Sequence, residues 1–198
     1  MSTAETLDRL ALPLGGTGQE QAAATTQAGI FALDVALSIV EAPTDEATAA
    51  KRLHYVAERC NDLTGQLARQ QLDRSMPNYG GIRAANGLYH PGAASAFIRN
   101  LTAAYVSPQS RFTGSTKLLE AMNDAATFML DVQHQDGTID LLTTNFHSTP
   151  DTGFILEWMC SAAGVLRAAD DPTLAPLLDR LLTFIKRGAD ALAVGGIH

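Results

Sequence analysis

Apolar residues recur at alternating spacings of three and four through six segments of this 198-residue chain. This spacing places them on one face of an α-helix, and no segment shows the alternation of a half-buried strand. The sequence therefore predicts an all-α chain in which the helices form antiparallel hairpins. The expected helices span about 19–41, 45–72, 92–106, 115–133, 151–169 and 173–193.

Length and composition are those of one folded domain covering residues 1–198. Hydrophobic residues make up 46% of the chain and charged residues 18%, which excludes a largely disordered protein. The net charge of −7, with no basic stripe, argues against nucleic acid as a partner. The chain shows neither a secretory leader nor a membrane-length apolar run, so we expect a cytoplasmic protein without a membrane partner.

The joins between the expected helices alternate between short and long. The two long ones cover about 20 residues (73–91) and about 17 residues (134–150), lengths that in a compact domain indicate function or disorder. Their polar and aromatic content favours function. Neighbouring helices linked by short joins run antiparallel, so successive joins fall at opposite ends of the array. Both long connections, together with 14–19 and 195–198, are therefore predicted to lie at one end.

The first long connection is rich in polar and aromatic side chains set among glycines, which let backbone approach a ligand closely. It is interpreted as a sugar-binding and catalytic lip. The alternative is a compact loop packed by its own aromatic rings, with the tyrosine hydroxyls satisfied locally. The candidate residues are Tyr79, Arg83, Asn86, Tyr89 and His90.

The second long connection places Asn145 and His147 just before the fifth expected helix, whose N-cap we expect to be Asp151. The open amides of a helix start attract anions. A histidine can transfer protons near neutral pH, and an asparagine can polarise a carboxyl group as a neutral donor. Trp158, one helix face further on, could line a sugar subsite. The alternatives are ordinary capping for Asp151, a structural role for His147 and a core position for Trp158.

A metal site is a competing use of His147, Asp151, His90 and Asp140, since a His and an Asp four residues apart can share a helix face. The chain has no HExxH, no CxxC and no denser ligand cluster, so we expect neither a metal nor a cofactor. The GxSxG, GxxxxGK[ST] and GxGxxG motifs are also absent. His134 follows a helix and is assigned only a favourable contact with the helix dipole.

Three segments set between helical hairpins, "GGIRAANGLYHPGAAS", "DGTIDLLTTNFHSTPDTGF" and "GGIH", resemble the helical domain of heparinase II/III-like polysaccharide lyases and related α/α-toroid proteins. The resemblance covers roughly residues 75–198. It implies a barrel of paired helices that binds an acidic polysaccharide across one end and cleaves it by β-elimination at a uronic acid. Carried onto this chain, it implies that Asn145 or His147 neutralises the substrate carboxylate and that Tyr89 or His90 acts as base and acid.

The chain departs from that family's pattern in length. Six helices are about half of a toroid, no β-sandwich follows, and the sequence stops at a motif that looks like the start of another cleft loop. We therefore expect an incomplete (α/α) toroid, which is either a fragment or half of an assembly completed by another copy. The resemblance makes Arg83 a substrate clamp, and the full set of substrate-binding candidates is Tyr79, Arg83, Asn86, Asp151, Trp158 and His198.

Two other functions fit the same sequence. A glycoside hydrolase on a similar scaffold needs two carboxylates facing the scissile bond, and the chain offers Asp136, Asp140, Asp151 and Glu157. A non-catalytic helical binding or assembly domain needs none of them, and its alanine-rich helix faces would be interfaces.

Overall fold

The computed structural model describes residues 63–108, 110–142 and 144–194. The helix expected at 19–41, most of the one expected at 45–72, and the segments 14–19 and 195–198 lie outside the described residues, as does His198. All statements about the fold concern the described part of the chain.

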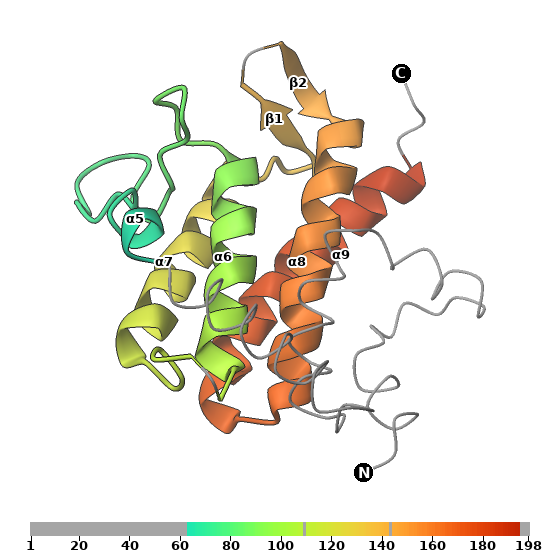
Figure 1. The fold of residues 1–198 in the computed structure, drawn as a ribbon. Helices are drawn as coiled ribbons and strands as arrows, with labels where there is room; N and C mark the ends of the chain where they lie inside the picture. Colours follow the sequence, from blue (N-terminus) through green and yellow to red (C-terminus); the bar gives the residue numbers. More distant parts are fainter. Residues whose placement is uncertain (1–62, 109, 143, 195–198) are drawn as a thin grey trace, which may run out of the picture.

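Helices dominate the described residues and confirm the expected helical class (Figure 1). The last four expected helices are present, with each end within about two residues of its expected position. A 3-10 turn, η1 (Pro172–Leu174), precedes the final helix. The helices are α5 (Thr64–Leu67), α6 (Pro91–Val106), α7 (Thr116–Val132), α8 (Thr149–Ala169) and α9 (Ala175–Val194).

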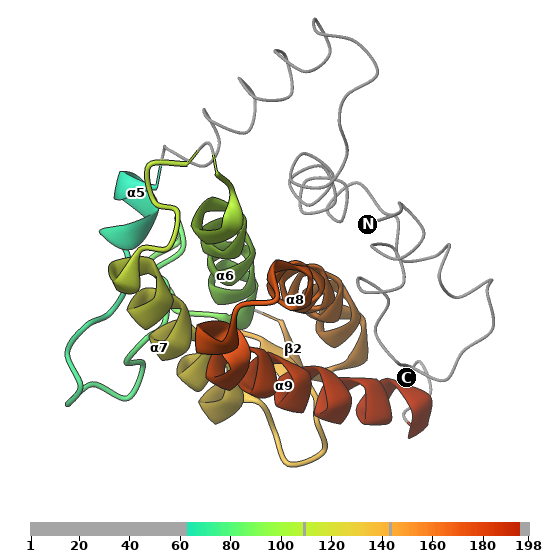
Figure 2. The same cartoon turned by 90° about the horizontal axis from the view of Figure 1, so that it is seen from below.

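The four long helices pack in two layers (Figure 2). Helices α6 and α8 lie side by side, and α7 and α9 form the second layer, so that α6 contacts α7 and α8 while α9 contacts the same two helices. The apolar stripe of each helix faces this shared core, as the periodicity predicts. The fully buried side chains at its centre include Phe97, Leu101, Leu118, Met122, Met159 and Phe184.

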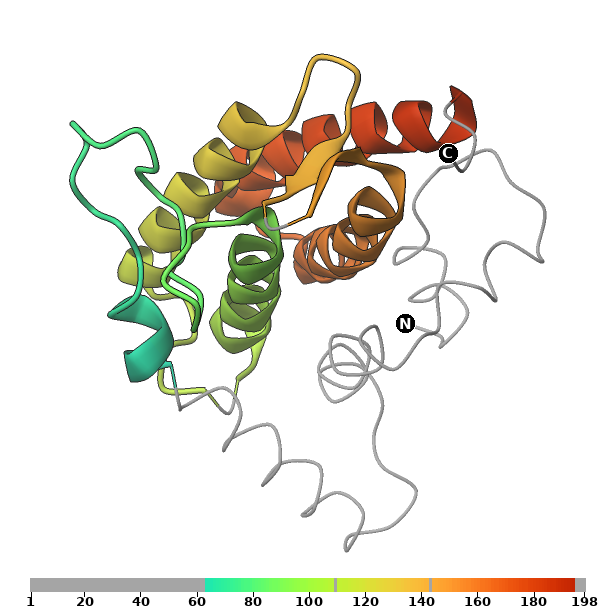
Figure 3. The ribbon, with the colours of Figure 1, turned by 90° about the horizontal axis from the view of Figure 1, so that it is seen from above.

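The second connection and the last part of the first, which leads into α6, lie at one end of the array, as parity predicts. In Figure 1 residues 133–148 and the segment leading into α6 are at the top, and the short joins 107–115 and 170–174 are at the bottom. The earlier part of the first connection instead lies along α7, where Gln70 bonds to the Ala121 carbonyl. Figure 3 shows that end directly: the first connection runs along α6 and α7, and the second crosses the helix ends beside α8.

A small sheet accompanies the helices. The second connection contains a two-stranded antiparallel hairpin, β1 (Ile139–Leu141) and β2 (Asn145–Ser148), in which Ile139 pairs with Ser148 and Leu141 with Asn145. The first connection contains isolated antiparallel bridges instead. Strands of three and four residues are too short for alternation to be visible in the sequence.

Two expected helix boundaries are wrong. The second helix is expected to run to 72, but the structure ends α5 at Leu67, and Gln70 pairs with Ile82 as an isolated bridge. The expected N-cap of α8, Asp151, lies inside its first turn. Ser148 is the N-cap, because its side chain accepts a hydrogen bond from the Asp151 backbone N–H.

Two residues shape the last helix and the turn before it. The Asp171 side chain accepts from the Thr173 N–H and caps η1. Gly188 is buried within α9, where a Cβ would lie 2.9 Å from Leu156. Glycine therefore permits close contact between α8 and α9. Among the described residues, no helix is long and apolar enough to cross a bilayer.

Candidate functional site

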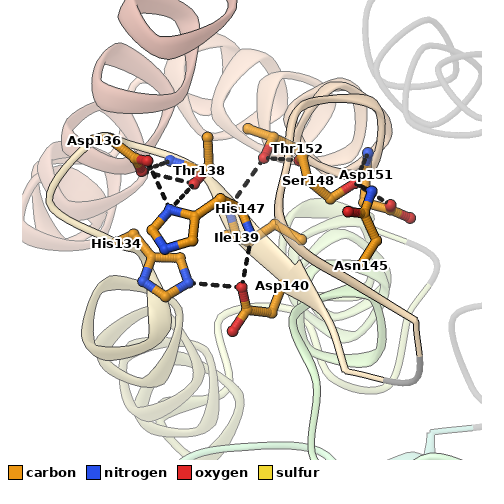
Figure 4. Close-up of polar contacts among 10 residues, drawn as sticks. All are labelled: His134, Asp136, Thr138, Ile139, Asp140, Asn145, His147, Ser148, Asp151 and Thr152. Carbon is orange, nitrogen blue, oxygen red and sulfur yellow. Dashed lines mark hydrogen bonds and ion pairs between the residues drawn. The ribbon is translucent and has the colours of Figure 1, made fainter. Parts of the chain in front are cut away.

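Two histidines and two aspartates from the second connection form one cluster beside the β1–β2 hairpin (Figure 4). His134 Nε2 lies 2.7 Å from Asp140 Oδ1, and His147 Nδ1 lies 2.7 Å from Asp136 Oδ2. The two imidazole rings stack, with centroids 3.9 Å apart and an interplanar angle of 19°. We call His134, Asp136, Asp140 and His147 the His–Asp cluster.

The turn that follows α7 places the first half of this cluster. Asp136 Oδ1 accepts hydrogen bonds from the Thr138 N–H at 2.9 Å and from the Thr138 hydroxyl at 2.6 Å. Gly137 between them has φ +88°, a conformation that favours glycine. The His134 N–H closes the turn on the Thr138 carbonyl at 2.9 Å. The turn therefore fixes the orientation of the Asp136 carboxylate.

The β1–β2 hairpin positions the second half of the His–Asp cluster. The His147 backbone N–H donates to Asp140 Oδ1 at 2.9 Å, so this carboxylate holds the backbone of one histidine and the ring of the other. His147 has φ +52°, a left-handed conformation that costs a non-glycine residue about 1–2 kcal/mol. Strain of this kind persists where the surroundings enforce it, and it is concentrated at functional sites.

The electrostatics favour ionised carboxylates in the cluster. The Thr138 hydroxyl and N–H, followed by His147, lower the pKa of Asp136 to about 2. Burial acts to raise the pKa of Asp140, but the His147 N–H and the His134 ring outweigh it and the pKa is lowered. An ionised carboxylate accepts the N–H of a neutral imidazole, which leaves a lone pair on the other ring nitrogen. The geometry thus assigns that lone pair to Nε2 of His147 and to Nδ1 of His134.

Asn145 belongs to a different group of side chains. Its Nδ2 donates to Ser148 Oγ at 3.0 Å, and the Ser148 hydroxyl donates to Asp151 Oδ2. Figure 4 shows the Asn145 side chain near Asp151, on the other side of β2 from the His147 ring. Asn145 and Asp151 thus share the start of α8, where the Asp151 carboxylate already supplies the negative charge that a helix N-terminus attracts.

The start of α6 carries the candidates from the first connection. Tyr89 pairs with Arg83 across a narrow hairpin and is half-buried against the core. His90 is the N-cap residue of α6 without a side-chain cap bond, and burial lowers its pKa. Asn86 Oδ1 accepts from the Leu88 N–H at 3.1 Å and so holds the turn itself.

The two remaining aromatic candidates lie on helix flanks. Tyr79 sits against α7, where burial and the Asp124 carboxylate raise its pKa, and the Arg74 guanidinium lies 4.8 Å from its ring centroid. Trp158 on α8 is half-buried, with the guanidinium of Arg99 on α6 5.1 Å from its ring centroid.

The structure therefore brings together only some of the predicted site residues. His147 lies with Asp136, Asp140 and His134, and sequence reasoning assigns the last of these no functional role. The compact spacing "HQDGTID", with one histidine and two aspartates in seven residues, is the signal that could have identified it. Tyr89 and His90 reach the same end of the array at the start of the neighbouring helix, and no hydrogen bond within the described residues joins them to the cluster.

The described residues offer no metal site, and no comparison with known proteins assigns the cluster a role. In residues 63–108, 110–142 and 144–194, no group of three or more His, Cys, Asp or Glu side chains is arranged to hold a metal ion. The chain matches no protein-family model, no curated protein and no solved structure.

Proposed function

We propose that this chain is the helical domain of a polysaccharide lyase that cleaves uronic-acid-containing glycans by β-elimination. The observation that carries the proposal is the pair of stacked imidazoles, each held by an ionised carboxylate, at the end of the array where α6 and α8 begin. Such an arrangement provides two proton-transfer groups at adjacent positions, with their tautomers set by the carboxylates.

The chemistry requires three tasks on one sugar ring. A base removes the proton at C5, a donor stabilises the substrate carboxylate as the enolate-like intermediate forms, and an acid protonates the leaving oxygen as the C4–O bond breaks and C4=C5 forms. In this proposal His147 Nε2 is the base, and Arg83 is the donor to the substrate carboxylate. Tyr89 or His90, at the start of the neighbouring helix, supplies the acid.

The helix arrangement supports the same family. Layers of side-by-side helices, α6 with α8 and α7 with α9, are the repeating unit expected of an (α/α) toroid. We propose that the array is an incomplete toroid in which a further part of the protein or another copy completes the cleft. Arg83, which is exposed at the same end, then serves as a clamp for an acidic sugar.

The carboxylates argue against the glycoside hydrolase alternative. A hydrolase needs one carboxylic acid that stays protonated, which requires a raised pKa. Asp136 and Asp140 both have lowered pKa values, with that of Asp136 about 2. Their geometry suits orientation of imidazoles rather than protonation of a leaving group.

The direct test is turnover of a panel of uronate polymers by the full chain, followed as the rise in ultraviolet absorbance of unsaturated uronide ends. We expect turnover with at least one polymer and a loss of roughly 100-fold or more in His147→Ala, because a general base contributes that much. Tyr89→Phe is expected to lose activity if Tyr89 is the acid. No product from any polymer would reject the lyase.

A matched pair of variants separates a specific loss from general damage. Asp136 and Asp73 each hold a similar turn, through Thr138 and Ser75 respectively, but only Asp136 contacts an imidazole. Asp136→Asn is expected to lower kcat/KM and Asp73→Asn to leave it unchanged. Equal losses in both variants would contradict a role for the His–Asp cluster in the reaction.

Exposed apolar side chains favour one second candidate, a non-catalytic binding or assembly domain. Phe146 lies next to His147 in β2, Phe154 lies on α8, and each exposes about two thirds of its surface. Exposed aromatic rings are typical of surfaces that bind glycans or other chains. Capture of a uronate polymer without any product would support this candidate over the lyase.

A further inference from the structure

The two long connections are held to the helical layers in the same way. Gln70 Nε2 donates to the Gly80 carbonyl at 3.3 Å and to the Ala121 carbonyl of α7 at 2.8 Å. Gln133 Nε2 donates to the Gly137 carbonyl at 2.9 Å and to the Phe184 carbonyl of α9 at 3.0 Å. In both cases the helix carbonyl lies 51 residues after the glutamine.

The backbone around each glutamine also matches. The Gly80 N–H donates to the Gln71 carbonyl and the Gly137 N–H to the His134 carbonyl, both at 2.9 Å. Each glycine has a positive φ, +81° and +88°, and lies directly on a carbonyl of the same outer helix layer. A buried isoleucine follows two residues after each glycine. The two connections therefore share one anchoring arrangement.

The copies differ in what the anchored turn carries. From Gln70 to Gly80 is ten residues, whereas from Gln133 to Gly137 is four, so the second turn is tight. In that tight turn His134 and Asp136 lie between the glutamine and its acceptor. Each belongs to a different His–Asp pair. Whatever fixes this turn on α9 therefore also fixes the separation of the two pairs.

We propose that Gln133 is a positioning residue that sets the geometry of the His–Asp cluster by clamping its turn to α9. The amide bridges the turn and the helix with one nitrogen, while Gln133 Oε1 is buried and has no hydrogen-bond partner within the described residues. An unpaired buried oxygen is unfavourable. The two donor bonds of the amide therefore have to offset this cost. The inference goes beyond the proposed reaction, because it concerns how the cluster is held and its test needs no substrate.

The test compares Gln133→Met with Gln70→Met in the full chain. Both variants remove a buried double donor of the same kind, but only the first lies in the turn that carries the cluster. Nitrogen-15 spectra of the imidazole rings at neutral pH report which ring nitrogen carries the proton. In the wild type we expect His147 protonated on Nδ1 and His134 on Nε2.

In Gln133→Met we expect both histidines to lose these distinct signals and to move toward the averaged tautomers of a free imidazole. In Gln70→Met we expect both signals to stay as in the wild type. Unchanged imidazole signals in folded Gln133→Met would overturn the proposal, and so would equal changes in the two variants, because these indicate a general loss of stability.

If Gln133→Met does not fold, Gln133→Asn and Gln70→Asn replace the pair. Asparagine keeps the amide but is one methylene too short to reach both carbonyls. We expect altered His134 and His147 signals in Gln133→Asn alone. Wild-type signals in that variant would overturn the proposal. Loss of lyase turnover without a tautomer change would implicate the reaction and not the clamp, so the two proposals can fail separately.

Discussion

The two long connections share an anchor but use their polar side chains differently. In the first connection, Asn86 accepts from the Leu88 N–H and Asp73 from Ser75, so these groups stabilise their own turns. In the second, Asp136 stabilises its turn and also holds His147. The shared frame of glutamine, glycine and isoleucine supports the backbone. The two connections therefore differ in the polar residues that lie outside this frame.

The largest expected effect tests the shared frame. A Cβ at Gly80 would lie 2.0 Å from the Asp124 carbonyl oxygen, and one at Gly137 would lie 2.1 Å from that of Arg187. Backbone atoms cannot move aside as side chains do, and both glycines have positive φ. Gly80→Ala and Gly137→Ala are each expected to cost about 3–5 kcal/mol in the free energy of unfolding, measured by urea denaturation.

Gly114→Ala is the matched control for that experiment. Gly114 has φ +65°, but no neighbouring atom lies within 4 Å of the place that an alanine Cβ would take, so only conformational strain is added. We expect a cost of about 1 kcal/mol. A similar cost at all three glycines would show that the close contacts with α7 and α9 do not matter.

The starts of the two side-by-side helices give the next effect. Ser148 caps α8 with its side chain, whereas His90 at the start of α6 makes no side-chain cap bond. Ser148→Ala is expected to lower the free energy of unfolding by about 1–2 kcal/mol, and His90→Ser to raise it by about 0.5–1 kcal/mol. Thermal and urea unfolding measure both changes. Stabilisation by Ser148→Ala would contradict the capping geometry.

The smallest effect concerns pH. The pKa of Asp136 falls from 3.8 in the unfolded chain to about 2, so its stabilisation is full above about pH 4 and is lost as the pH falls through 2. Because half of the side chain is exposed, solvent screening limits the contribution to about 0.5–1 kcal/mol. Urea unfolding between pH 5 and pH 2 should show this loss in the wild type and not in Asp136→Asn.

Asp73 sharpens this comparison. Its pKa is also lowered, through the Ser75 hydroxyl and N–H, but no imidazole within the described residues contacts it and its side chain is exposed. We expect Asp73→Asn to reduce the pH dependence of unfolding less than Asp136→Asn does. A larger effect at Asp73 than at Asp136 would mean that the His147 contact adds nothing to the folded state.

Helix periodicity and parity predicted much of the fold. The positions of α6 to α9 and the shared end of the second connection and the segment leading into α6 follow from local spacing and chain geometry. Local sequence rules are also sufficient to predict the N-cap of α8. Ser148 with an acidic residue three positions later resembles a capping box, and Pro150 suits the first turn.

The His–Asp cluster was harder to predict from the sequence, because its contacts join residues that are not close in the chain. His147 was a candidate from its chemistry, but the stacking on His134 requires the hairpin register and the tight turn together. The repeated frame was hidden by the longer separation of Gln70 from Gly80, ten residues against four, and by acceptors that lie 51 residues further along the chain. Spacing within one segment cannot reveal such pairings.

The distant acceptors have a consequence for the order of folding. The carbonyl that Gln133 requires belongs to Phe184, well inside α9, so the turn after α7 cannot reach its final form until the last described helix has docked. Contacts between residues so far apart in the chain form later than the local contacts of a helix, because the entropy cost of closing the intervening chain comes first. During synthesis the four helices can thus form in sequence, and the His–Asp cluster reaches its final geometry only after α9 has docked. The cluster is therefore among the last parts of the described domain to form.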